Sequence, residues 1–258
     1  MDKYIIPISY STPTRHVSWF SRLFPNLSFY SRIPGVVIEA ARLAKKGAYS
    51  DEEWVKSSRA IIDLLEVVGV SLRMENVSAI SGLDTPCVFV GNHMSVLETF
   101  VLPCIIQPHM KFTFVIKESL IHYPVFKYVM RSRNPIVVGR VNPREDFIKV
   151  LEQGFERLSQ GISVLIFPQK TRTTQFDPKS FNSVGVKLAK KAGVPVVPFA
   201  LKTDAWGIGR WIKDFGKIDP SKQVRFWFGN PITVNGRGKD EHEAVIQFIA
   251  DKLKIEEG

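Results

Sequence analysis

The sequence predicts an α/β fold with a mostly parallel sheet covered by helices and preceded by an N-terminal helical pair. The chain has 258 residues, which is enough for one large domain with a buried core. From Val70 onward, short apolar runs of strand length alternate with segments of helical periodicity. This alternation is typical of parallel strands joined by helices. We therefore predict an N-terminal segment with a helical pair at 1–69 and an α/β domain at 70–258.

The first part of the chain combines bulky apolar side chains with cations. Residues 16–46 are rich in Trp, Phe, Tyr, Leu and Ile, and Pro25 and Pro34 interrupt them. Rings that sink into the headgroup boundary and cations that face lipid phosphates are typical of a membrane-interfacial segment. The alternative is a helix that packs on the protein's own core, but the net charge of +10 favours the membrane. The cations concerned are Arg15, Arg22, Arg32, Arg42, Lys45 and Lys46.

A long helix is predicted to follow this segment. Ser50 and Glu53 have the spacing of a capping box at its start. Apolar residues then recur at helical spacing from Trp54 to Val68, and Gly69 is a typical stop. This helix and the segment before it form the predicted helical pair.

The remaining elements follow the alternating pattern. Strands are predicted at 70–74, 87–90, 112–116, 136–138, 162–167, 194–201 and 224–228. Helices are predicted at about 96–106, 119–131, 144–160, 182–192 and 239–254. The third helix is the clearest, because Asn142 and Pro143 suit its start and Gly161 suits its end. In such a sheet, functional residues gather in the turns after the carboxyl ends of the strands.

Composition narrows the classes of function. Cys87 and Cys104 are too few for a disulfide framework or a metal cluster, and the five histidines lack metal-ligand spacing, so we predict no metal site. The excess of positive charge suits an anionic partner, but no motif typical of nucleic-acid binding occurs. No apolar run reaches the roughly 18 to 20 residues of a spanning helix, and no secretory signal pattern is present. We therefore expect a protein associated with the cytoplasmic face of a membrane.

The pair Asn92-His93 follows the apolar run CVFV, at the end of a predicted strand. On a continuous helix, His93 and Glu98 would be separated by about 140°. They can meet only if His93 lies in the turn and Glu98 lies on the next helix, and the capping-box spacing of Ser95 and Glu98 supports a helix start there. A carboxylate that fixes the imidazole tautomer would leave the other ring nitrogen free to accept a proton. The alternative is an ordinary helix cap beside a loop histidine.

The stretch NHMSVLE at 92–98 is followed by FVIKESLIHYPVF at 114–126, IVVGR at 136–140, FPQKTRT at 167–173 and VPVVP at 194–198. In this order the stretches resemble the motifs of the 1-acylglycerol-3-phosphate acyltransferase (lysophospholipid acyltransferase) family. The resemblance covers roughly residues 70–235 and is far more specific than any one motif alone.

The resemblance implies transfer of a fatty acyl chain from a thioester, on coenzyme A or acyl carrier protein, to a hydroxyl of a lysophospholipid such as lysophosphatidic acid. His93 would take the proton from that hydroxyl, and Glu98 would orient the imidazole and stabilise its charge. Arg172 is the candidate to bind the acceptor's phosphate. No cofactor is implied besides the thioester co-substrate, and the implied partners are a membrane lipid and an anionic membrane surface. The residues implied in substrate binding are Asn92, Ser95, Lys117, Arg140, Thr171 and Arg172.

Three positions depart from the family pattern. Glu98 stands where the family usually has Asp, which keeps a carboxylate and lengthens its reach. Gln169 replaces a Glu and Lys170 replaces a Gly, which removes one negative charge and adds one positive charge beside the implied phosphate site. Two alternatives therefore stay open: an acyltransferase for a non-glycerophospholipid acceptor, such as a glycolipid or an amino-acid lipid, or a non-catalytic lipid-binding homologue.

Overall fold

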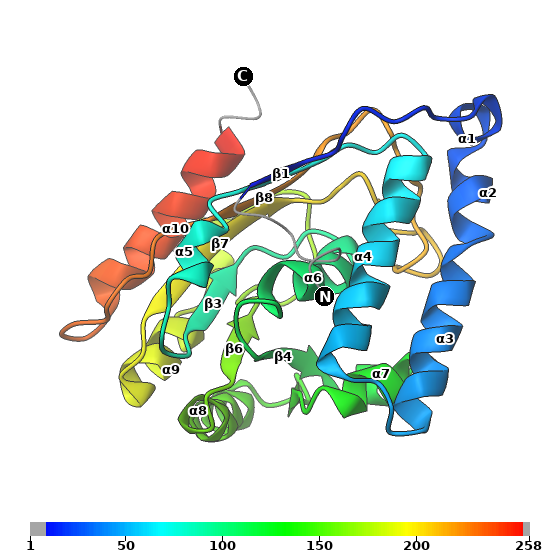
Figure 1. Cartoon of the computed structure of the whole chain (residues 1–258). Helices are drawn as coiled ribbons and strands as arrows, with labels where there is room; N and C mark the ends of the chain where they lie inside the picture. Colours follow the sequence, from blue (N-terminus) through cyan, green and yellow to red (C-terminus); the bar gives the residue numbers. More distant parts are fainter. Residues whose placement is uncertain (1–8, 255–258) are drawn as a thin grey trace.

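An eight-stranded sheet forms the centre of the computed structural model, which describes residues 9–254 (Figure 1). In sheet order its strands are β1 (Tyr10–Ser11), β2 (Leu72–Glu75), β8 (Val224–Phe228), β7 (Val196–Lys202), β3 (Val88–Gly91), β6 (Ser163–Ile166), β4 (Phe112–Lys117) and β5 (Ile136–Val138). The block from β7 to β5 is parallel, whereas β8 pairs with β7 in the antiparallel direction. The carboxyl ends of five neighbouring strands therefore meet along one edge of the sheet.

Helices cover both faces of this sheet (Figure 1). Those at the N-terminal end of the chain are α1 (Trp19–Leu23), α2 (Pro25–Tyr30), α3 (Ile33–Lys45) and α4 (Asp51–Val67). The others are α5 (Ser78–Ser81), α6 (Leu97–Ile106), η2 (Glu118–Ile121), α7 (Phe126–Ser132), α8 (Pro143–Ser159), η3 (Pro178–Ser180), α9 (Val184–Ala192) and α10 (Lys239–Lys254). Helices α3, α4, α6 and α7 lie on one face, and α8, α9 and α10 lie on the other.

Strand β3 shows how the sequence builds two cores. Phe89 belongs to the core beneath α4 and α6, whereas Val88 and Val90 belong to the core beneath α8, α9 and α10. Successive side chains of a strand point to opposite faces, so a central parallel strand is apolar on both. All four residues of β3 are buried, which explains why the sequence CVFV is continuously apolar.

The fold class predicted from the sequence is confirmed, with local differences. The single helix predicted at 119–131 is instead a short η2 and a separate α7, because Pro124 disfavours helical backbone before it and Val125 has a φ of +64°. The short elements β1 and α5 were not predicted. The division of the chain between residues 69 and 70 stays a prediction.

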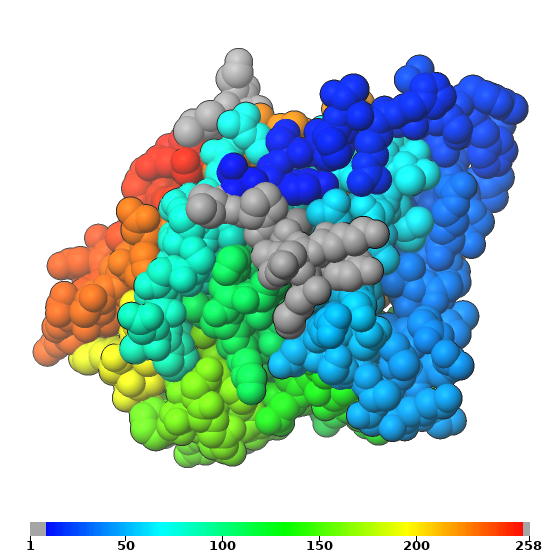
Figure 2. All heavy atoms as spheres, viewed as in Figure 1, coloured from blue at the N-terminus to red at the C-terminus, as the bar shows by residue number. Residues whose placement is uncertain are grey.

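The aromatic segment before α4 has a buried and an exposed side. Phe29 and Ile33 pack in the core, whereas Trp19, Leu23 and Leu27 are exposed. Figure 2 shows this dark-blue part of the chain along one edge of the molecule. One part of the segment thus packs on the protein's own core, and another part exposes the apolar side chains expected of a membrane-interfacial segment. Its contact with a membrane stays a prediction. Among residues 9–254, no helix has the length and apolar character needed to cross a bilayer.

Several cations of this segment contact the protein itself. Arg15 forms an ion pair with Glu66 at 3.2 Å, and Arg42 forms one with Glu39 at 2.8 Å. Arg32 donates a hydrogen bond to the Ser28 carbonyl at 3.1 Å. The predicted set of lipid-facing cations is therefore partly engaged in contacts within the chain.

Helix α4 holds the position of α6 through one hydroxyl. Ser58 Oγ donates to the Phe100 carbonyl at 2.6 Å and accepts from the Cys104 N–H at 3.0 Å. The Ser58 hydroxyl thus inserts between two backbone groups of α6 next to Pro103. Because Pro103 lacks an N–H, α6 is without one of its own hydrogen bonds there. Inserted polar groups of this kind replace missing helix bonds, and here the insertion fixes α6 against α4.

Gly91, the last residue of β3, tests how tightly this part of the core is packed. An added Cβ would lie 2.3 Å from the Phe199 ring, so we expect Gly91→Ala to lower the free energy of unfolding by about 1–3 kcal/mol. At Gly35 in α3, an added Cβ would meet no atom within 4 Å, so we expect Gly35→Ala to be neutral or stabilising by up to about 1 kcal/mol. Urea unfolding measures both, and a neutral Gly91→Ala would contradict the close packing on Phe199.

Candidate active site

Residues from five strand ends surround one region of the sheet edge. His93 follows β3, Lys117 ends β4, and Arg140 follows β5. The segment from Gln169 to Arg172 follows β6, and Thr203 follows β7. Because these strands are parallel, their carboxyl ends lie at the same edge, where α/β proteins commonly bind ligands.

The structure brings His93 and Glu98 into contact. Nδ1 of His93 lies 2.9 Å from Oε1 of Glu98. His93 is in the turn after β3 and Glu98 is in the first turn of α6, which is the arrangement predicted from their spacing. Because an ionised carboxylate only accepts hydrogen bonds, Nδ1 carries the proton and Nε2 is left as the basic nitrogen.

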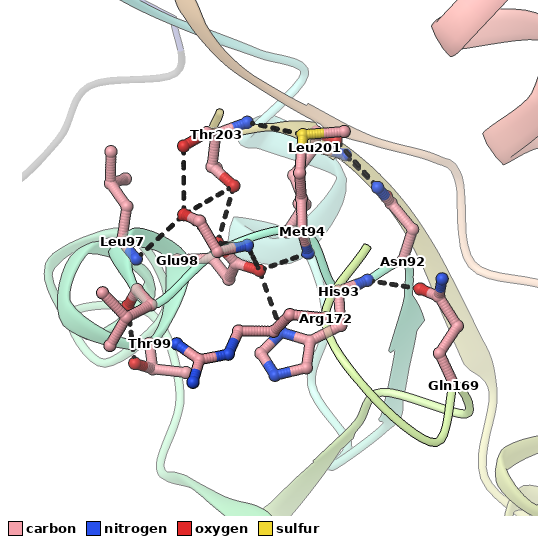
Figure 3. A network of polar contacts seen from close by, with 12 residues as sticks. Asn92, His93, Met94, Leu97, Glu98, Thr99, Gln169, Arg172, Leu201 and Thr203 are labelled. Carbon is pink, nitrogen blue, oxygen red and sulfur yellow. Dashed lines mark hydrogen bonds and ion pairs between the residues drawn. The ribbon is translucent and has the colours of Figure 1, made fainter. Parts of the chain in front are cut away.

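Glu98 is fully buried and accepts hydrogen bonds from several segments (Figure 3). Its Oε1 accepts from the backbone N–H groups of Met94 at 2.7 Å and Ser95 at 2.8 Å. Its Oε2 accepts from the hydroxyls of Ser95 at 3.0 Å and Thr203 at 2.6 Å. The carboxylate thus connects the turn after β3, helix α6 and the end of β7.

These contacts determine the charge state of Glu98. Burial by itself raises the pKa of a carboxyl group, but the hydrogen bond and charge of His93, together with the Thr203 hydroxyl, hold the pKa of Glu98 below its usual value. Glu98 is therefore an anion at neutral pH. A buried anion beside Nδ1 fixes the tautomer of His93 and leaves Nε2 as the ring nitrogen that can accept a proton.

His93 is held on its other sides by the segment after β6. Its ring stacks on Phe167 with the centroids 4.2 Å apart. Its backbone N–H donates to Oε1 of Gln169 at 2.5 Å, and its carbonyl accepts from the N–H of Thr173 at 3.0 Å. The amide oxygen of Gln169 thus joins the two motifs without a carboxylate, and the side chain of His93 remains 15% exposed.

Asn92 and Ser95 bond to the protein itself. Asn92 exchanges two hydrogen bonds with the backbone of Leu201, at 2.8 and 2.9 Å. The Ser95 hydroxyl accepts from the Leu97 N–H at 3.1 Å, and the Ser95 N–H donates to Glu98, so half of the predicted capping box forms. Both side chains are buried and position the backbone around His93. Their contact with substrate stays a prediction.

The cations form a second part of the site. Arg172 pairs with Asp214 at 2.6 Å, and both side chains are partly exposed. Arg140 donates to the Lys170 carbonyl. Burial and the nearby charge of Arg172 lower the pKa of Arg140, while Asp146 opposes this effect. The positive charge of Arg172 thus acts on Arg140, and an anion bound beside them would offset this repulsion.

The backbone at Arg140 is unusual for a non-glycine residue. Its φ is +60°, and Asp146 holds it there by accepting the N–H groups of Gly139 at 2.9 Å and Arg140 at 2.8 Å. Such a conformation costs free energy and is most often kept at functional positions. Lys170 does not need a positive φ, so its replacement of a glycine is accommodated in the loop.

Lys117 and Thr171 are exposed, and neither side chain forms a hydrogen bond or ion pair within the part of the chain that the structure describes. Lys117 is the last residue of β4 and Thr171 lies on the segment after β6, at the same edge as His93. Four contacts were not predicted from the sequence: Phe167 on His93, Gln169 on the His93 N–H, Thr203 on Glu98 and Asp214 on Arg172.

Similarity to known proteins agrees with this geometry. The profile of the Acyltransferase family matches residues 70–202, about half of the chain. The chain belongs to the Acyltransferase family. The resemblance seen in its motifs is thereby confirmed.

Members of this family include relatives with assigned activities. The chain is 34% identical over 136 residues to the 1-acyl-sn-glycerol-3-phosphate acyltransferase of Pseudomonas aeruginosa, covering 52% of each chain. It is 30% identical over 130 residues to the chloroplastic 1-acyl-sn-glycerol-3-phosphate acyltransferase LPAT1 of Arabidopsis thaliana, covering 50% of this chain and 35% of the relative. The chain thus spans about half the length, or less, of these acyltransferases.

A solved structure shares the fold. The crystal structure of the 1-acyl-sn-glycerophosphate (LPA) acyltransferase PlsC from Thermotoga maritima matches with a TM-score of 0.67 at 21% identity, covering 92% of this chain and 96% of that one. This likeness confirms the mixed α/β architecture around the acyltransferase motifs.

Glu98→Gln tests the network around this carboxylate. The amide NH₂ would face the N–H and O–H donors that Glu98 now accepts, so we expect a loss of about 1–3 kcal/mol in the free energy of unfolding at pH 7. The folded-state pKa of Glu98 is lowered, so its ionised form contributes stability that is complete above the usual value of 4.5 and is lost as the pH falls below it. The difference between wild type and variant should therefore shrink in acid.

Urea unfolding at neutral and acid pH measures this difference. Glu152→Gln, on the exposed side of α8, is the matched control and should change stability little at either pH. A difference between wild type and Glu98→Gln that stays constant with pH would show that the charge of Glu98 does not contribute.

Proposed function

We propose that this protein transfers a fatty acyl chain from an acyl thioester to a hydroxyl of a lysophospholipid, with 1-acylglycerol-3-phosphate as the preferred acceptor. The observation that supports this proposal most strongly is the pair of His93 with the buried anion Glu98, next to a segment that carries Arg172. The names of the relatives from Pseudomonas aeruginosa and Arabidopsis thaliana point to the same acceptor.

In the proposed reaction, Nε2 of His93 takes the proton of the acceptor hydroxyl as its oxygen attacks the thioester carbonyl. The negative charge of Glu98 stabilises the imidazolium that forms. The tetrahedral intermediate collapses by breaking the carbon–sulfur bond, and the leaving thiolate receives the proton from Nε2. The new ester and a free thiol are the products, so no covalent acyl-enzyme is needed.

The cations of the site suit the acceptor's phosphate. Arg172 offers two parallel N–H donors to a phosphate, and Arg140 adds charge beside it. Lys117, Lys170 and Thr171 are exposed around this position and are proposed to make further contacts. Asp214 forms an ion pair with Arg172, so a phosphate that binds Arg172 must displace this carboxylate.

A narrow apolar crevice beside α6 is the proposed site for a fatty acyl chain; its volume is about 30 Å³, so the helices around it would have to move apart to admit the chain. It lies between α3, α4, α6 and α7 and is lined by residues that include Val36, Ile61, Phe100 and Val129. Thr99 and Phe100, which follow Glu98 directly, are part of its wall. Either coenzyme A or acyl carrier protein is proposed to deliver the thioester.

We propose that the protein lies on the cytoplasmic face of a membrane as a peripheral or monotopic protein. The exposed side chains of α1 and α2, among them Trp19, Leu23 and Leu27, would enter the headgroup boundary. The net charge of +10 would attract the protein as a whole to anionic lipids.

One observation favours a second acceptor class. Because Asp214 pairs with Arg172, the site already contains one anion and can receive a headgroup that carries both charges, such as an amino-acid lipid. A glycolipid acceptor would use the same hydroxyl chemistry. A non-catalytic lipid-binding role is disfavoured, because the His93–Glu98 pair is complete.

His93→Ala tests the proposed base. We expect acceptor-dependent thiol release from long-chain acyl-coenzyme A or acyl carrier protein to fall by roughly 10²–10⁴-fold, because proton removal from the acceptor is lost. A panel of lysophosphatidate, zwitterionic lysolipids and glycolipids identifies the acceptor class in the wild type. Equal rates for wild type and folded His93→Ala would rule out the base role, and silence of the wild type with both donors would favour lipid binding alone.

Arg172→Ala and Asp214→Asn test the anion site. Loss of Arg172 should raise the KM for lysophosphatidate by about 10- to 100-fold, because charged hydrogen bonds to the phosphate are lost. Asp214→Asn should lower that KM several-fold, because the competing carboxylate is gone. Arg237→Ala, in the exposed turn before α10, is the control. An increase of KM in Asp214→Asn as large as that in Arg172→Ala would assign the pair a purely structural role.

A further inference from the structure

The connection between β7 and β8 contains a compact loop at residues 207–216. Two backbone hydrogen bonds close the loop. At its base the N–H of Gly207 donates to the Lys217 carbonyl at 2.9 Å, and nearer its tip the N–H of Gly209 donates to the Lys213 carbonyl at 3.1 Å. A Cβ at Gly209 would lie 2.1 Å from the Ile212 carbonyl oxygen, so only glycine fits there. The loop is therefore a built element with a defined shape.

The outer side of this loop exposes large apolar side chains. Trp211 is 92% exposed, and Ile212 and Phe215 are 54% and 57% exposed. Leaving such large apolar side chains in water is unfavourable relative to burial. Tryptophan in particular is enriched where a protein meets the headgroup region of a bilayer. The loop thus presents a surface suited to an interface of mixed polarity.

The cationic side chains of the loop and its carboxylate have different surroundings. Arg210 and Lys213 in the loop, and Lys217 directly after it, are exposed to solvent. The loop has one carboxylate, Asp214, and it is turned toward the site, where it pairs with Arg172 at 2.6 Å. The outward surface is therefore apolar and cationic, which complements the anionic headgroups of a lipid surface.

Buried contacts fix the loop to the body of the protein. Trp206 at its base is buried, and its ring stacks on Phe100 of α6 with the centroids 5.7 Å apart. Nε1 of Trp206 donates to the carbonyl of Asp214 at 3.2 Å. Any surface that holds the loop thereby also fixes the distance to Arg172 and α6.

The loop also adjoins the N-terminal helices, beside α2 in Figure 1. Phe215 lies 5.8 Å from the ring of Tyr30, and the Ile218 N–H donates to Asn26 at 2.7 Å. The exposed side chains of the loop and those of α1 and α2 therefore belong to neighbouring parts of the structure, although they are far apart in sequence.

We propose that residues 207–216 form a second bilayer-docking element, in which Trp211 and Ile212 enter the headgroup region of an anionic membrane while Lys213 and its neighbours contact lipid phosphates. Docking of this loop holds Arg172 at the lipid surface, where an acceptor headgroup is found. The statement about the acceptor rests on the proposed function, whereas membrane binding by the loop does not.

Vesicle binding tests the proposal without any acyl donor. Wild type, the double variant Trp211→Ser/Ile212→Ser and the matched control Ile148→Ser/Phe155→Ser are sedimented with vesicles of phosphatidylcholine containing phosphatidylglycerol. The control residues are exposed apolar side chains on α8. We expect partition of the loop variant to fall by about tenfold or more and that of the control to stay unchanged. Lys213→Gln should reduce the preference for anionic over neutral vesicles by roughly fivefold.

Two outcomes would overturn the proposal. Equal partition of the loop variant and the wild type would assign membrane binding to α1 and α2 alone. A dimer in analytical ultracentrifugation that the loop variant abolishes, without vesicle binding, would assign the surface to a second copy of the chain. Urea unfolding of each variant confirms its fold. Loop-dependent binding by a protein without thiol-release activity would contradict only the proposed function, and loop-independent binding by an active protein would contradict only this inference.

Discussion

The ionised carboxylate of Glu98 in a fully buried position is the constraint on which this structure depends. A buried charge is costly unless donors surround it, and the donors here come from His93, from the turn at 94–95 and from Thr203. Meeting this requirement fixes the turn after β3, the start of α6 and the end of β7 relative to one another. The position of the His93 ring is a consequence of the same contacts, so stability and reactivity share one network.

The sequence predicts the sheet and the order of motifs well, because strand-length apolar runs and local caps depend on neighbouring residues. The contact of His93 with Glu98 was one of two alternatives that the spacing and the capping pattern left open, and the structure shows this contact. Thr203 could not be predicted, because it reaches Glu98 from a strand end more than a hundred residues away. Asp214 lies in a loop whose path depends on glycines and on Trp206, and neither gives a local pattern that points to Arg172. The break at Val125 was missed because the apolar periodicity continues across it.

The family departures acquire a physical meaning in the structure. Gln169 accepts the His93 N–H through an amide oxygen, a task that does not require a negative charge. What changes is the electrostatic field, since a neutral amide replaces an anion and Lys170 adds a cation. Asp214 restores one negative charge from a different part of the chain. The charges of the site therefore come from two loops, the one after β6 and the one that carries Asp214. A comparison of motifs covers only the first loop and so misses the negative charge of Asp214.

The hydroxyl of Ser58 inside α6 has a consequence for how this protein can change over time. Replacing Ser58 by an apolar residue would leave the Phe100 carbonyl and the Cys104 N–H buried without their partner, next to a proline that already weakens the helix. Helices α4 and α6 must therefore be inherited together. The exposed side chains of α1 and α2 make no such contact with a second helix, so we expect substitutions among homologues to be more frequent at these positions than in α4 and α6.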